Sequence, residues 1–237
     1  MMSDAKDSGS EHTMGAKSHQ FLKNVYSWLF FAISLSVVTA LMTHYLDLLP
    51  PEPERSKVLG YIGSIRTAAI LLGMTAARMG RAKIVGSLYI LSSVGAGVSM
   101  GSLFTFATTE SMASIFVMTL ALFGAFSVFG YTSSRDLSPL AWLYSFSFFF
   151  FLIFWKVFPI PVPELIDIAV AFGLLINLLI LSYETQKTRA CAHSSYLSAK
   201  RGESMALFQS FTLFIAFQIT FAGVFFLLFV PRSGSPS

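Results

Sequence analysis

Glu184 is the residue whose type and setting best suit ion chemistry. It stands in the run Ser182-Tyr183-Glu184-Thr185-Gln186, where the sixth of seven apolar segments ends. Oxygen ligands suit a hard cation such as Ca²⁺, and partial burial raises the pKa of a carboxyl group. Glu184 is therefore the candidate metal ligand and pH-sensing group. The alternative is an ordinary carboxylate at the end of a helix.

Other ionisable residues also fall in or beside apolar segments. Arg66 lies inside the second segment, either as a gate or counter-ion or as an arginine that reaches the lipid headgroups. Glu164 and Asp167 open the sixth segment, where capping at the positive end of a helix explains them better than ion binding does. His44 ends the first segment and is interpreted as an interfacial histidine.

Residues that suggest catalysis are few. The sequence has no HExxH zinc motif, no phosphate-binding GxxxxGK[ST] loop and no pair of aspartates in an intramembrane protease setting. The single cysteine, Cys191, cannot form an intramolecular disulfide or a multi-thiolate metal site. We therefore expect no catalytic residue, no enzymatic activity and no resident cofactor.

The composition is that of an integral membrane protein. Of 237 residues, 54% are hydrophobic and only 12% are charged, and the mean hydropathy is +0.68. These values exclude a disordered chain, a disulfide scaffold and an ordinary cytosolic enzyme. The net charge of +4 comes from Lys and Arg scattered over short loops, so no nucleic-acid partner is expected and the lipid bilayer is the expected surrounding.

Seven apolar segments predict an all-α bundle of seven transmembrane helices, since each crossing needs about 20 apolar residues. They are 24–45, 57–77, 84–106, 111–131, 140–158, 165–183 and 205–230. Residues 1–23 are predicted to form a disordered cytosolic tail, 24–230 the membrane domain, and 231–237 a short polar tail. The loop 184–204 is predicted to join the last two helices.

The positive charges predict the sidedness of the chain. The amino-terminal tail and the second, fourth and sixth loops carry eleven Lys and Arg, against four on the opposite side. Because positively charged loops stay in the cytosol, we expect a cytosolic N-terminus.

In the third segment, Ser93, Gly97 and Gly101 form a small-residue face that favours close helix packing, either within the bundle or between subunits. The oligomeric state stays open.

Four stretches of the chain resemble the Bax inhibitor-1 family, also called the transmembrane Bax inhibitor motif proteins. Gln20–Tyr26 is similar to the family's HLKxVY entry into the first span, and Ser114–Thr119 to its fourth-span pattern. Arg135–Ser138 resembles a K/R-D-L-S turn, and Phe172–Gln186 aligns with FGLL…DTQ, with Glu184 in place of the aspartate. The resemblance extends from residue 20 to about residue 230.

This resemblance implies six helices around a central seventh, and residence in the endoplasmic reticulum or another internal membrane of eukaryotes. It also implies suppression of stress-induced cell death and a pH-sensitive Ca²⁺ leak. It also implies cell-death regulators or other membrane proteins as partners. A second hypothesis is a non-conducting scaffold that binds membrane proteins through the small-residue face of the third segment and the aromatic fifth segment.

The resemblance also extends the list of site residues. The family attributes the leak to one aspartate in the sixth span and one in the seventh, held by an arginine latch. The sixth-span position is Glu184, whereas the seventh-span aspartate falls on Gln209 or, with a one-residue slip, on Ser210. The latch falls near Arg78 or Arg81, with Arg66 as a further candidate. Because neither Gln209 nor Ser210 ionises, we expect blunted pH sensing.

Overall fold

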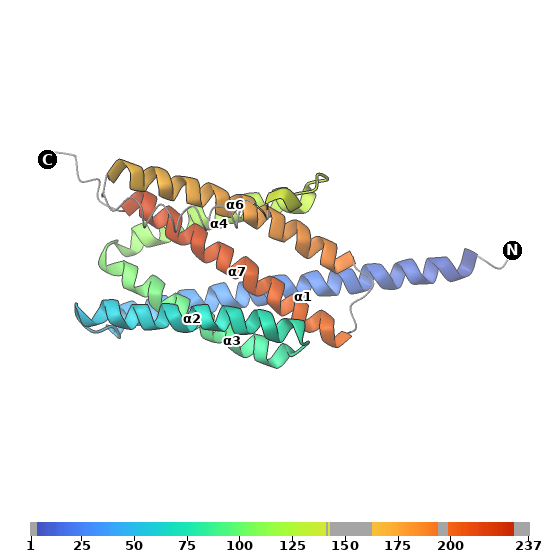
Figure 1. Ribbon diagram of the computed structural model, residues 1–237, viewed down its shortest axis with the longest axis horizontal. Coiled ribbons are helices and arrows are strands. Elements are labelled where there is room, and N and C mark those ends of the chain that lie inside the picture. Colours follow the sequence, from blue (N-terminus) through green and yellow to red (C-terminus); the bar gives the residue numbers. More distant parts are fainter. Residues whose placement is uncertain (1–3, 141, 143–162, 194–198, 230–237) are drawn as a thin grey trace. The chain divides into compact units, whose positions relative to one another are not determined.

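The structure is a computed structural model that describes residues 4–140, 142, 163–193 and 199–229 (Figure 1). These residues form helices and turns, with no strand among them. Among the described residues, six helices are long and apolar enough to cross a membrane. The all-α membrane fold is therefore confirmed. The predicted fifth segment, 140–158, falls outside the described residues apart from positions 140 and 142.

The helices follow the predicted order along the chain. They are α1 (Asp4–Tyr45), α2 (Glu54–Arg78), α3 (Ala82–Gly101), the short 3-10 helix η1 (Ser102–Thr105), α4 (Thr109–Thr132), α6 (Pro163–His193) and α7 (Ala199–Phe229). They form two compact units. Unit 1 comprises residues 1–105 and 188–214, and unit 2 comprises residues 106–187 and 215–237. Helices α6 and α7 therefore contribute residues to both units.

In unit 1, α3 packs against α1 through the small-residue face (Figure 1). A Cβ atom added to Gly97 would lie 2.5 Å from the carbonyl oxygen of Ser36. The Ser36 hydroxyl donates a hydrogen bond of 2.9 Å to the carbonyl of Ser93. Of the two alternatives for this face, the structure shows packing inside the bundle, because small side chains let the two backbones approach.

A cluster of three aromatic rings forms another part of the core of unit 1. The Tyr89 ring on α3 stacks on Phe211 of α7, with centroids 4.9 Å apart, and meets Phe214 edge-on. All three side chains are at most 1% exposed. Rings of this size make many van der Waals contacts, which stabilise helix association within a membrane, so this cluster holds the first half of α7 against α3.

In unit 2, the second half of α7 packs against α4 and α6. The Phe217 ring meets Phe116 and Phe123 of α4 edge-on, at 5.9 and 5.7 Å. On its other side, Asn177 of α6 donates hydrogen bonds of 3.0 Å to the Ala216 carbonyl and 2.9 Å to the Thr220 hydroxyl. Such bonds between helices stabilise a bundle where no water competes for the donors.

Two boundaries differ from the sequence-based expectation. Helix α6 continues to His193, so the predicted loop start at Glu184 is wrong. Residues 184–193 contain no glycine or proline that would end a helix. Helix α1 begins at Asp4, inside the predicted tail. The division into tail and membrane domain stays a prediction.

Candidate functional site at the end of α6

Glu184 lies within α6 and is largely buried. Its side chain is 13% exposed, and the ammonium group of Lys187 lies 3.4 Å from Oε2. The same ammonium group lies 5.7 Å from the centre of the Tyr183 ring. The three residues form a local cluster on one helix, because residues three apart lie on the same face. The basic partner seen here therefore comes from α6 itself.

A close contact between α4 and α6 positions this cluster. A Cβ atom added to Gly130 of α4 would overlap the carbonyl oxygen of Ser182, two residues before Glu184. The Ser182 hydroxyl donates a hydrogen bond of 3.0 Å to the carbonyl of Phe126 on α4. Only glycine permits this backbone approach, so Gly130 sets the distance between the two helices at the depth of Glu184.

Gln186 ties the same part of α6 to the turn that follows α4. Its Oε1 accepts a hydrogen bond of 2.9 Å from the backbone N–H of Leu137. Its Nε2 donates to the carbonyls of Arg135 at 2.6 Å and Ser133 at 3.4 Å. One amide side chain thus satisfies three backbone groups that no helix pairs. Two motifs that are distant in sequence, Arg135–Ser138 and the run ending at Gln186, are joined here.

The turn is further stabilised by Asp136. Its carboxylate accepts a hydrogen bond of 2.9 Å from the backbone N–H of Ser138. The Ser138 hydroxyl, and after it the Ser138 N–H, lower the pKa of the Asp136 carboxyl below its ordinary value, because both favour the ionised form. Asp136 therefore keeps its negative charge at the turn and acts as a cap for the residues that follow.

Replacing Gln186 with leucine should free the turn. The Leu137 amide would lose its acceptor and exchange with solvent deuterium about fivefold faster, the effect of losing about 1 kcal/mol of hydrogen bonding. Hydrogen exchange of the peptide containing residues 133–140 measures this. Gln20→Leu is the control, since Gln20 is exposed on α1 and bonds to Asn24 within its own helix. Equal protection in Gln186→Leu and the native chain would contradict the assignment.

The two seventh-span candidates face different neighbours. In unit 1, the Gln209 side chain is 1% exposed and accepts a hydrogen bond of 3.2 Å from the Thr188 hydroxyl. Its Nε2 lies 4.0 Å from Cys191 Sγ, also on α6. Ser210 instead lies 2.9 Å from the Tyr89 hydroxyl on α3. Because consecutive helical residues point about 100° apart, only Gln209 faces α6.

The three latch candidates all lie in unit 1. Arg66 is at the middle of α2, half-buried, and its Cδ lies 2.9 Å from where a Cβ of Gly95 would be. Arg78 ends α2, and Arg81 precedes α3, where its carbonyl accepts the Ile84 and Val85 amides. Arg78 and Arg81 are exposed. Their role as a latch stays a prediction.

The structure also shows the surroundings of several other residues of interest. The His44 ring stacks on Phe104 at 4.6 Å, a partner that sequence proximity could not indicate. The side chains of Glu164 and Asp167 lie outside the described residues. The run Gly97–Gly101 has the GxSxG spacing of a nucleophile elbow, but it lies inside α3 and Ser99 donates to the Gly95 carbonyl. It lacks the strand-to-helix turn that such an elbow requires.

Sequence reasoning missed Tyr89, Thr188, Gly130 and the role of Gln186. Tyr89 and Thr188 are buried polar residues in membrane-crossing helices. A polar side chain within an apolar segment was the available signal, because such residues are costly in lipid unless they find a partner. Gly130 carried no signal of its own, since its neighbour is set by the packing of α4 on α6.

One known protein family matches this chain over most of its length. The family model described as "Inhibitor of apoptosis-promoting Bax1" matches residues 18–233, which include every site residue described above. The chain belongs to the Bax inhibitor-1 family. The resemblance found in the four sequence motifs is thereby confirmed.

Two curated relatives agree with the Bax inhibitor-1 assignment. Inner membrane protein YbhL of Escherichia coli strain K12 is 31% identical over 125 residues, which cover 50% of this chain and 51% of the relative. The protein of the same name from E. coli O6:H1 gives the same values. The chain spans about half the length of the curated relatives it matches. Both relatives are named as inner membrane proteins, in agreement with a multi-pass Bax inhibitor-1 protein.

Proposed function

We propose that this chain is a membrane protein that restrains cell death and carries a Ca²⁺ leak from an internal store, with Glu184 as the ion-binding and titrating residue. The family supports the first part, and the burial of Glu184 supports the second. The proposal includes residence in the endoplasmic reticulum, a cytosolic N-terminus, cell-death regulators as partners and the absence of enzymatic activity.

The burial of Glu184 is the observation that carries the leak. A carboxylate that is only 13% exposed places two oxygen atoms, the ligands that a hard cation prefers, inside the helix packing. Lys187 is 41% exposed, so it can turn toward solvent when a cation arrives. The pair thus offers an exchange of Lys187 for Ca²⁺ at the same carboxylate.

The leak is proposed to respond weakly to pH. Gln209 holds the position on α7 that faces α6, and an amide does not titrate near neutral pH. One carboxyl group alone releases one proton, without the coupled steps of two neighbouring acids. The pH dependence of the leak should therefore be shallow.

The test is Ca²⁺ release from liposomes that contain the protein, measured between pH 5 and pH 8 (roughly the range over which a coupled pair would titrate). We expect a shallow pH profile and a flux lowered about tenfold in Glu184→Gln, the effect of losing about 1.4 kcal/mol of cation binding. Glu110→Gln is the control, because Glu110 is an exposed acid at the start of α4. A steep response that is lost in Glu184→Gln would refute the blunted pH sensing.

A non-conducting scaffold is the second candidate, favoured by the uncharged Gln209. The scaffold hypothesis assigns partner binding to two surfaces. One of them, the small-residue face of α3, is covered by α1 inside unit 1 and is not available to a partner. The other surface, the aromatic fifth segment, lies outside the described residues apart from positions 140 and 142. Native protein that gives no Ca²⁺ flux above empty liposomes would favour the scaffold.

A further inference from the structure

We propose that the turn between α2 and α3 binds the headgroup of an anionic phospholipid. The turn carries three cationic side chains within six residues, Arg78, Arg81 and Lys83, and all three are exposed. Gly80, with φ of +70°, reverses the chain. The Gly80 and Arg81 amides bond at 3.0 Å to the carbonyls of α2's last turn, so the three charges are held close together.

Few acidic residues are available to neutralise this positive charge. The sequence contains no Asp or Glu from residue 55 to residue 109, which covers almost all of α2 and α3. The neighbouring helix α7 carries one acid close in sequence to this contact, Glu203, which precedes Ser204, whose hydroxyl donates a hydrogen bond of 3.3 Å to the Ala77 carbonyl. Glu203 is exposed. Within the described residues, no ion pair joins it to the three cations.

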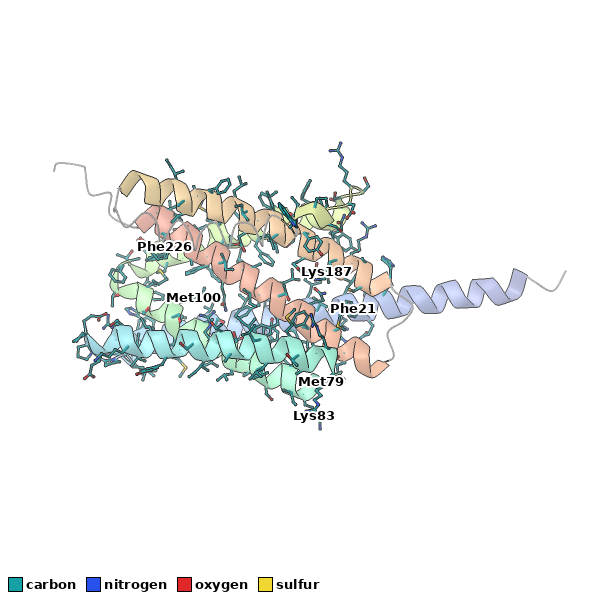
Figure 2. The ribbon with its side chains drawn as sticks, in the orientation of Figure 1. Phe21, Met79, Lys83, Met100, Lys187 and Phe226 are labelled. Atoms are coloured by element: carbon teal, nitrogen blue, oxygen red, sulfur yellow. The ribbon has the colours of Figure 1, made fainter. Side chains whose placement is uncertain are left out.

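The flanking side chains favour a lipid over a soluble anion. Met79 is 60% exposed and Ile84 is 43% exposed, and they lie on either side of the charged residues. The two candidate spans end at Arg78 and begin at Ala82, so the turn lies where a membrane helix meets the headgroups. Figure 2 shows Met79 and Lys83 at the end of α2 and α3 where this turn joins them, and Met100 toward the other end of α3. A phosphate beside acyl chains matches cations beside apolar side chains.

The test uses the full chain in detergent, titrated with phosphatidylglycerol, with phosphatidylcholine of the same acyl chains, and with inorganic phosphate. Native mass spectrometry counts the bound lipid. We expect saturable binding of phosphatidylglycerol that weakens about fivefold for each cation replaced in Arg78→Gln, Arg81→Gln and Lys83→Gln. Lys57→Gln, at the other end of α2, is the control and should bind within about twofold of the native chain.

Each outcome decides the proposal. Equal binding of phosphatidylcholine, or undiminished phosphatidylglycerol binding in the triple variant, overturns it. Inorganic phosphate that binds as tightly as the lipid assigns a free-anion site and also overturns it. The variant Arg78→Lys with Arg81→Lys keeps the charge and should keep the binding, which separates a loss of charge from a loss of folding. None of these measurements depends on Ca²⁺ flux.

Discussion

Gly130→Ala should destabilise the protein by about 3 kcal/mol, at the upper end of the cost of overpacking a core. The added methyl group would overlap the backbone carbonyl of Ser182, which cannot rotate away as a side chain could. Helix α6 would have to move away from α4, and the hydrogen bond from Ser182 to Phe126 would lengthen. Thermal or denaturant unfolding in detergent measures the loss.

The matched control is Gly124→Ala on the same helix. A Cβ atom at Gly124 meets nothing within 4 Å among the described residues. Alanine is also the better helix former by up to about 1 kcal/mol, so this variant should be as stable as the native chain or slightly more stable. If the two variants unfolded at the same temperature, the close α4–α6 contact would not exist in solution.

Gly130→Ala should also affect function. Ser182, Glu184 and Gln186 lie within five residues of α6, and both ends of this stretch are held by α4 or by the turn after it. A displaced α6 would carry Glu184 with it. We therefore expect Gly130→Ala to lower any Glu184-dependent flux even though it leaves every charged residue in place.

Gln209→Asp should give the proposed leak a steep pH dependence, and this is the largest functional change that we expect. The Gln209 side chain faces Thr188 and Cys191 of α6 and is 1% exposed. The family resemblance pairs this position with that of Glu184. The resemblance implies that acids at these two positions interact, and interacting acids release their protons in coupled steps, so the flux should change across two titrations instead of one.

Liposome flux between acidic and neutral pH measures this gain. Gln209→Asn is the control, because asparagine has the size of aspartate but does not ionise. It should keep the shallow profile of the native chain. The double variant Glu184→Gln with Gln209→Asp again has one acid, so its profile should be shallow as well. A steep profile in that double variant would show that the introduced carboxyl acts without Glu184.

Much of the fold could be predicted from residue composition alone. The segments predicted at 57–77, 84–106 and 205–230 correspond to α2, to α3 with η1, and to α7, with ends that differ by only a few residues except at the start of α7. Membrane insertion depends on the summed hydropathy of about 20 consecutive residues, which is a property of the segment itself. The end of α6 was misplaced because polar residues that continue a helix out of the membrane carry no hydropathy signal.

The candidate site could be predicted only in part. Sequence comparison selected Glu184 but left Gln209 and Ser210 as alternatives, since they are adjacent residues in one motif. The structure distinguishes them through their partners, Thr188 for Gln209 and Tyr89 for Ser210. Gln186 was visible only as a motif residue, and its three bonds to the turn after α4 join residues about fifty positions apart.

The amino-acid sequence was therefore sufficient for the membrane class, most of the spans and the family, because these depend on local composition and on the order of short motifs. Tertiary structure was needed to show which neighbour each polar side chain meets, and which glycines, such as Gly130, must stay glycine. The reason is physical: a helix has the same hydropathy whichever way it is rotated, and only packing against other helices selects one rotation.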